Sequence, residues 1–200
     1  MGILERKQKQ KEDVKNSILQ AAWQLVQSEG WQALSIRRIA DAIEYSVPVI
    51  YCHFENKEAI LLEFTKEGFG LLAAQLQAAK DSFELPGLQL EAMAQAYWHF
   101  AFNHKEYYQL MFGLGMPACE TVNQVGQMKI FKDLLISVIR EAIARSKNPE
   151  TDQGLKFQTY WSILHGLVSI QMFGSGAAPT LTQQLILKDA IDGYIKALEG

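Results

Sequence analysis

Almost nothing in this sequence of 200 residues favours a β-strand, and that constrains the fold more than any other feature. No segment alternates apolar and polar residues for long, and no Asn-Gly or Asp-Gly hairpin stands between strand-like runs. Apolar residues instead recur at spacings of three and four, as they do in amphipathic helices. The sequence therefore predicts an all-α fold.

Composition is that of an ordinary globular protein, with 48% hydrophobic and 20% charged residues, enough for one sizeable core or two small ones. No stretch reaches the roughly 18 apolar residues that a membrane span needs, so a cytoplasmic protein is expected. The two cysteines, Cys52 and Cys119, have neither the spacing of a metal-ligand pair nor a disulfide framework. We interpret both as free thiols.

Net charge says less about the partners of the protein. The whole chain carries −3 and residues 1–60 are neutral, so the charge differs only weakly between the two parts. A nucleic-acid partner is not favoured by this total, since affinity for phosphate comes mainly from Lys and Arg. The first fifteen residues nevertheless form a basic arm that we expect to be disordered, and a solvated tail explains it as well as a binding segment does. Its basic residues are Arg6, Lys7, Lys9, Lys11 and Lys15.

The N-terminal third contains signals for four helices. The first should span residues 12–28 and end at Gly30. Ser35 and Ser46 should each cap a short helix, and Pro48 falls in the first turn of the second one, where its missing N–H costs nothing. That helix should end near residue 54. Asn56 should cap a fourth helix over 57–80, roughly 36 Å long at 1.5 Å per residue.

Longer helices are predicted beyond residue 86, where Pro86-Gly87, Asn148-Pro149 and the segment 174–180 act as breaks. The predicted ranges are 88–104, 105–112, 122–146, 152–173 and 181–198.

Two short helices joined by three or four residues match a helix-turn-helix, whose second helix lies in the DNA major groove. The stretch LSIRRIADAIEYSVPVIYCHFENKEAILLEF, residues 34–64, resembles the N-terminal domain of the TetR family of transcriptional regulators. The resemblance rests on the Ile-Ala pair, the Ser that opens the recognition helix, the Tyr-x-x-Phe that closes it and the following Lys-Glu.

This resemblance implies a DNA-binding domain over 1–55, with the helix over 57–80 as a connector, and a ligand-binding and dimerisation domain over 56–200. It also implies a homodimer on a near-palindromic operator, most often a repressor released by a small molecule. Tyr51 and Lys57 would contact phosphates, and Val47, Pro48 and Val49 could meet thymine methyl groups. Further candidates for DNA contact are Ser35, Arg37, Arg38, Ser46, Cys52 and His53.

One residue departs from the family pattern in the turn between these helices. Glu44 stands where the family usually has Gly. If the turn holds this position at positive φ, a non-glycine residue there costs on the order of 1 kcal/mol. Either Glu44 tolerates that conformation or the turn differs. The role of Arg38 also stays open, because this residue could equally form an ordinary surface ion pair or contact DNA.

The C-terminal part offers candidates for an effector cavity. The helix containing AMAQAYWHFAF is apolar nearly all round, so it should be central, and its Gln and His either are structural or line a cavity with apolar walls. We expect a largely apolar or aromatic ligand. The candidate residues are Gln95, Trp98, His99, Phe102, Tyr108, Met111, Phe112, Trp161, His165 and Met172.

Dimer contacts are expected on the last two helices, where small residues would let a second backbone approach. The candidates are Ser162, Gly166, Ser169, Leu185, Ile186, Ala190, Ile191 and Tyr194. The pattern of Trp161, His165 and Gly166 also resembles one C-terminal subclass of the family.

Two other classes of protein are possible alternatives. An enzyme is disfavoured, because nucleophile elbows, phosphate-binding glycine loops and metal-ligand spacings are missing, and no cofactor or metal is predicted. His99, His104, His165 and Cys119 could converge on a metal, but their spacing predicts nothing. A helical ligand-binding module without DNA affinity is the remaining alternative.

Overall fold

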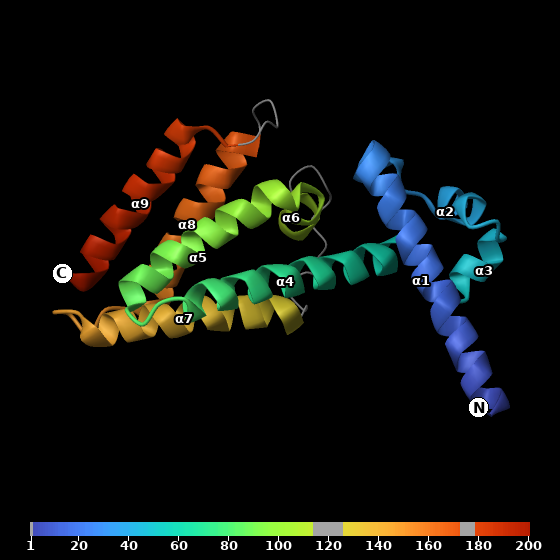
Figure 1. Cartoon of the computed structure of the whole chain (residues 1–200), viewed down its shortest axis with the longest axis horizontal. Coiled ribbons are helices and arrows are strands. Elements are labelled where there is room, and N and C mark those ends of the chain that lie inside the picture. Colours follow the sequence, from blue (N-terminus) through green and yellow to red (C-terminus); the bar gives the residue numbers. More distant parts are fainter. Residues whose placement is uncertain (1, 114–125, 173–178) are drawn as a thin grey trace. The chain divides into compact units, whose positions relative to one another are not determined.

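The computed structural model describes residues 2–113, 126–172 and 179–200, and every regular element within these ranges is a helix (Figure 1). The all-α prediction is confirmed. The chain divides into two compact units, Met1–Phe64 and Thr65–Gly200, with the division inside helix α4 (Lys57–Asp81). In the described ranges, no helix combines the length and apolar character required to cross a membrane.

Helix α1 spans Ile3–Glu29 and therefore begins much earlier than the predicted residue 12. The expectation of disorder in the basic arm is wrong for residues 3–15, which are helical. Lys, Arg, Gln and Glu dominate this stretch, and all four are good helix formers. The helix ends as predicted at Gly30, whose φ is 80° and whose N–H donates to the Val26 carbonyl at 2.8 Å.

The first unit is built on α1, a 3₁₀ turn (Trp31–Ala33), two short helices, α2 (Ile36–Ala42) and α3 (Val47–Tyr51), and the first turns of α4. Its core combines aliphatic residues of α1 and α2 with aromatic rings. Trp31 lies 6.0 Å from Trp23 and 5.7 Å from Phe64 between ring centroids. The buried members include Ile18, Ala22, Val26, Leu34, Ile39, Ile50, Phe54 and Ile60.

The second unit contains the rest of α4 and five further helices. These are α5 (Pro86–Asn103), α6 (Lys105–Phe112), α7 (Gly126–Arg145), α8 (Gln153–Met172) and α9 (Leu181–Glu199). Helix α5 is central as predicted, because it contacts all four of the others. Pro86 forms its first helical residue rather than a break, a place where proline needs no N–H partner.

Several sequence predictions fall partly outside the described residues. The residues outside the described ranges are Cys119, residues 122–125 of the predicted helix 122–146, and Phe173 of the predicted helix 152–173. The other predicted helix ends lie within a few residues of the observed ones.

Candidate DNA-binding surface and effector site

The turn between α2 and α3 closes through two backbone hydrogen bonds. The Tyr45 N–H donates to the Ala40 carbonyl at 3.0 Å, and the Glu44 N–H donates to the Asp41 carbonyl at 3.3 Å. This is the bonding of a Schellman motif, with Glu44 at the left-handed position and φ of 58°. Glu44 therefore adopts the conformation that the family usually gives to Gly.

Helix α3 begins at the predicted residue but not with the predicted cap. Ser46 occupies the cap position, yet its side chain accepts no hydrogen bond there. The Val49 N–H instead donates to the Ser46 carbonyl at 2.9 Å, which satisfies that amide through the backbone. By contrast, the Ser35 hydroxyl accepts the Arg38 N–H at 3.3 Å and caps α2 as predicted.

The two faces of α3 differ in what they contact. Ile50 is fully buried, and Phe54 just beyond the helix is 4% exposed, so one face anchors the helix in the core. The other face is outside: Pro48, Tyr51 and Cys52 are exposed, and Val47, Val49 and His53 are half-buried. An apolar helix start without strong hydrogen-bonding groups thus faces outward.

Polar groups flank this face on the neighbouring helices. Arg37 is exposed in the first turn of α2, and Lys57 is the first residue of α4. The Asn56 side chain accepts the Ala59 N–H at 2.8 Å, which caps α4 as predicted. The start of α4 therefore combines the N–H groups of a helix N-terminus with a basic residue, an arrangement suited to a phosphate.

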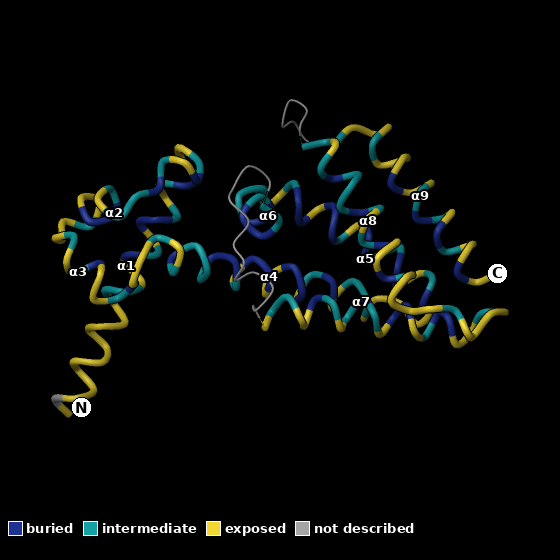
Figure 2. Tube along the Cα trace, turned by 180° about the vertical axis from the view of Figure 1, so that it is seen from behind, coloured by how far each residue is buried: buried dark blue, intermediate teal, exposed yellow. Residues whose placement is uncertain are grey.

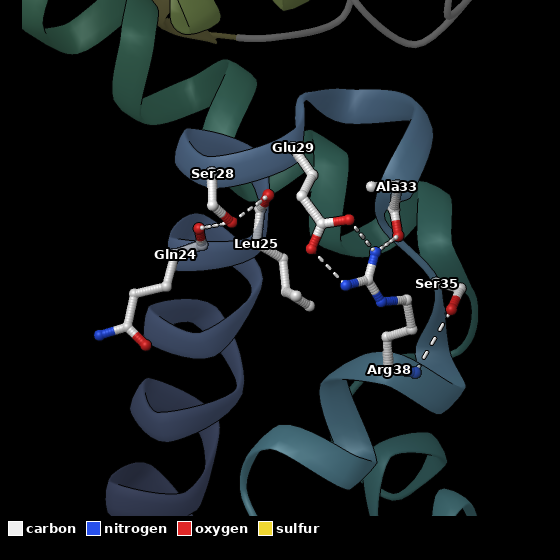
Figure 3. A network of polar contacts seen from close by, with 7 residues as sticks. All are labelled: Gln24, Leu25, Ser28, Glu29, Ala33, Ser35 and Arg38. Carbon is white, nitrogen blue, oxygen red and sulfur yellow. Dashed lines mark hydrogen bonds and ion pairs between the residues drawn. The ribbon is translucent and has the colours of Figure 1, made fainter.

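Arg38 is engaged within the unit (Figure 3). Its guanidinium forms a two-pronged ion pair with the Glu29 carboxylate, with one hydrogen bond at 2.9 Å, and donates to the Ala33 carbonyl at 3.3 Å. The hydrogen bond to Arg38 lowers the pKa of Glu29. The ordinary ion pair that the sequence left open for Arg38 is thus present in the structure, and a DNA contact by this residue stays a prediction.

The effector candidates separate into two groups in the second unit. The first surrounds what we call the tyrosine–histidine cluster, Tyr97, Tyr108 and His165. The Tyr108 hydroxyl lies 2.7 Å from His165 Nδ1 and 3.1 Å from the Tyr97 hydroxyl. Helices α5, α6 and α8 thus each contribute one polar group to the same point.

Aromatic rings enclose the cluster. Phe112 lies 5.1 Å from His165 and 4.7 Å from Tyr108 between ring centroids, and Trp161 lies 6.1 Å from His165. Burial raises the pKa of both cluster tyrosines and lowers the pKa of His165. The cluster is therefore a neutral set of hydrogen-bonding groups on an aromatic wall.

The second group of effector candidates borders a groove between α5 and α9. Gln95, Trp98 and His99 line it together with α9 residues such as Leu185 and Lys188, and its volume is about 450 Å³. Gln95 and His99 are exposed, so they do not line an internal cavity as expected. The periodicity of α5 located them on one stripe but could not tell that this stripe faces outward.

The remaining effector candidates lie around these two groups. Phe102 packs on Trp98 with ring centroids 5.0 Å apart. Met111 lies against Gly68 of α4, where an added Cβ would approach its Sδ to 2.6 Å, so Gly68 permits a close approach of α6. Met172 is half-buried in the last turn of α8.

The dimer candidates are also divided. Ile191 and Tyr194 are buried within the chain, and the Tyr194 hydroxyl donates to the Lys156 carbonyl at 2.9 Å. These two residues belong to the core and are not presented to a second copy, which corrects the expectation. Ser162, Leu185 and Ile186 are exposed, while Gly166, Ser169 and Ala190 are half-buried.

Both parts of the chain match family models. The N-terminal model, described as "Bacterial regulatory proteins, tetR family", matches residues 18–64. The second, "Tetracyclin repressor-like, C-terminal domain", matches residues 90–192, more than half of the chain. The chain belongs to the TetR family of transcriptional regulators. TetR regulators bind DNA and respond to effectors, typically as dimers, and are not enzymes.

Solved structures agree with this TetR fold. A protein of unknown function from Rhodococcus sp. RHA1 is 24% identical, with a TM-score of 0.76 over 93% of this chain and 95% of the other. The TetR regulator PfmR from Thermus thermophilus is 19% identical, with a TM-score of 0.65 over 90% and 97%.

A third similar structure, FadR from Bacillus subtilis in complex with stearoyl-CoA, is 18% identical, with a TM-score of 0.67 over 92% and 97%. At these identities the structures establish the fold alone. A search of curated proteins gives no significant match. The subclass suggested by Trp161, His165 and Gly166 stays a prediction for this TetR protein.

Tyr97 belongs to the candidate effector cluster although its place in the sequence does not mark it as a candidate. It stands one position before Trp98 in an apolar helix and looks like an ordinary core residue. Its link to Tyr108 depends on the break at His104, after which α6 starts in a new direction. Only the folded arrangement brings the two hydroxyls together.

Proposed function

We propose that this TetR-family protein is a homodimeric repressor that leaves a near-palindromic operator when a small, largely apolar or aromatic effector binds. The observation that carries the DNA-binding part is the outward, apolar start of α3, held by the buried Ile50 and Phe54. A surface of this kind suits the major groove, where apolar side chains can contact thymine methyl groups.

The proposed DNA contacts fall into two kinds. Val47, Pro48 and Val49 would meet base edges, with Ser46, Cys52 and His53 beside them. Tyr51, which is 53% exposed, and Lys57 would hold phosphates. Ser35 and Arg37 could add to these, because a capping hydroxyl can accept an N–H and still donate its own hydrogen.

Substitution of the two phosphate contacts tests this proposal. Duplexes should first be selected from a random-sequence pool with the wild-type protein. The variant Tyr51→Ala/Lys57→Ala should bind every duplex more weakly and with a flatter salt dependence. Wild-type affinity in that variant would refute the assigned contacts.

Dimerisation is proposed through the apolar α8–α9 face, defined by Leu155, Ser162, Gly166, Ile170, Ile186 and Gly193. Leu155 and Ile170 are 63% and 68% exposed, an unusual degree for such side chains. A Cβ added at Gly166 or Gly193 would meet no described atom within 4 Å, so the backbone is open to a partner there. Two-fold pairing would set the recognition helices about one DNA turn apart, roughly 34 to 36 Å or a multiple.

Gly166→Leu tests this face without disturbing the chain itself, because the new side chain enters open space. The variant should stay folded and lose dimer in sedimentation at micromolar concentration. Gly70→Leu is a matched control, since a Cβ there also meets nothing described within 4 Å. Unchanged association in Gly166→Leu, or a monomeric wild type, would rule out this interface.

For the effector, the tyrosine–histidine cluster supports binding through a few neutral polar groups on aromatic walls, a common composition of ligand sites. The similar FadR structure holds stearoyl-CoA, a molecule with a long apolar part, which is consistent with an apolar effector. The Gln95, Trp98 and His99 groove is the alternative position. Helix α4 would carry the signal, because it begins at Lys57 and continues into the second unit.

Coupling between the two sites requires that the effector bind the DNA-free protein more tightly than the DNA-bound protein. A difference of about 1.4 kcal/mol in its binding free energy lowers DNA affinity tenfold. By reciprocity, the operator must weaken effector binding by the same factor. Calorimetric titration of a binding compound, found by a thermal-shift screen, should therefore give lower affinity when a selected duplex is present. Equal affinities in both titrations would eliminate the coupling.

A further inference from the structure

Helix α1 begins well before the segment that the N-terminal family model matches. The family match begins at residue 18, and Ile18 is buried. Residues 4–17 are exposed or half-buried and form an extension of about four turns, visible as the N-terminal stretch of tube in Figure 2.

The basic residues of the extension are sorted by face. Lys7, Lys11 and Lys15 follow one another at spacings of four, so they share one stripe of the helix, and Ile18 continues that stripe toward the core. Arg6 and Lys9 lie on other sides of the same turns. Lys15 already forms an ion pair with Glu63 at 3.4 Å and lies over the Phe54 ring at 5.7 Å. Lys7 and Lys11 are exposed.

This stripe borders the end of the recognition helix. One shallow groove is lined by Lys11, Lys15, Cys52 and His53, and an adjoining one by Lys7, Lys11 and His53. Both grooves therefore lie between the extension and the residues that follow α3. Glu12 is the acidic residue on the rim.

We propose that Lys7 and Lys11, with His53 opposite them, bind a phosphate of the DNA backbone beside the major groove that α3 enters. The proposal rests on the function proposed above. A helix in the major groove has a phosphate strand on each side, so basic residues next to its end meet one of those strands. Cys52 and His53 line these grooves beside the base-reading start of α3 and would form the floor of this phosphate site.

Salt dependence of DNA binding tests the site, because each phosphate that a lysine neutralises adds to the slope. With a duplex selected by the wild type, Lys7→Gln/Lys11→Gln should reduce the slope of log affinity against log salt by about 0.9 per DNA-binding head, the value for one phosphate, and weaken binding on the order of tenfold at low salt. Lys7→Arg/Lys11→Arg should keep the wild-type slope. Glu12→Gln should strengthen binding.

The matched control is Arg6→Gln/Lys9→Gln, which removes the same charge from other faces of the same helix. It should reduce the slope by less than half as much. An unchanged slope in Lys7→Gln/Lys11→Gln, or an equal reduction in the control, would overturn the proposal. A wild type that binds no duplex would refute the proposed function, and this site with it. Circular dichroism of each variant verifies that α1 remains helical.

Discussion

The two units of this TetR regulator differ in the sequence separation of the contacts that define their helices. In the first unit, α2 and α3 have only seven and five residues. Ser35 sets the start of α2, Glu44 its end and Asn56 the start of α4, each acting within a few positions. In the second unit, key contacts join distant positions: the Tyr160 hydroxyl donates to the Leu90 carbonyl, 70 residues away, at 2.6 Å. A local signal can be recognised in a sequence, whereas a distant contact exists only once the helices have packed.

The largest expected effect tests the packed core of the second unit. Phe131 is fully buried, with ring centroids 6.2 Å from Phe69 and 6.3 Å from both Tyr97 and Trp161. Phe131→Ala should lower the free energy of unfolding by about 3 to 5 kcal/mol, measured in urea. Phe83→Ala, at a side chain 43% exposed, should cost less than about 1 kcal/mol. Similar costs for both would mean that this core does not dominate stability.

A smaller effect tests the local signals of the first unit. Ser35→Ala should lower the free energy of unfolding by about 1 kcal/mol, because it removes a capping hydrogen bond. Ser46→Ala should cost much less, since that hydroxyl caps nothing. The same unfolding assay compares them, and equal costs would contradict the distinction drawn between the two serines.

This contrast explains which predictions succeeded. The all-α class, the capping of α2 and α4 and the stop at Gly30 depend on neighbouring residues and were predicted. Three features that depend on other helices were not predicted: the outward direction of Gln95 and His99, the burial of Tyr194, and the choice of Glu29 as the partner in the ion pair that was one alternative for Arg38. The helical state of residues 3–15 was missed for another reason: a stretch with so few apolar residues shows no amphipathic stripe, although its helix propensity is high.

The turn at Glu44 offers a local change that should stabilise. Glu44→Gly removes the steric cost of φ at 58°, on the order of 1 kcal/mol, and the greater freedom of unfolded glycine offsets part of that gain. Thermal unfolding should show a small rise in midpoint. Glu44→Ala removes the charge but keeps the Cβ and should show no rise; a rise in both would assign the effect to charge instead.

The smallest expected effect concerns pH. Because burial lowers the pKa of His165 in the folded chain, the unfolded chain binds more protons below the ordinary value of 6.5. Its contribution to stability is therefore present above that pH and is lost as pH falls. From about pH 7.5 to about pH 5.5, the wild type should lose more stability than His165→Gln does. His99→Gln, at an exposed position, should behave as the wild type, and the same pH dependence in all three would exclude this role.

The apolar start of α3 as a DNA-reading surface is the central claim, and thymine methyl groups provide its most direct test. Fluorescence anisotropy should compare a selected duplex with the same duplex carrying uracil in place of thymine, which deletes only methyl groups. We expect wild-type affinity to fall about fourfold per contacted methyl, the equivalent of about 0.8 kcal/mol for each buried carbon. Val47→Ala/Val49→Ala should bind both duplexes alike. Equal wild-type affinity for the two duplexes would contradict the account.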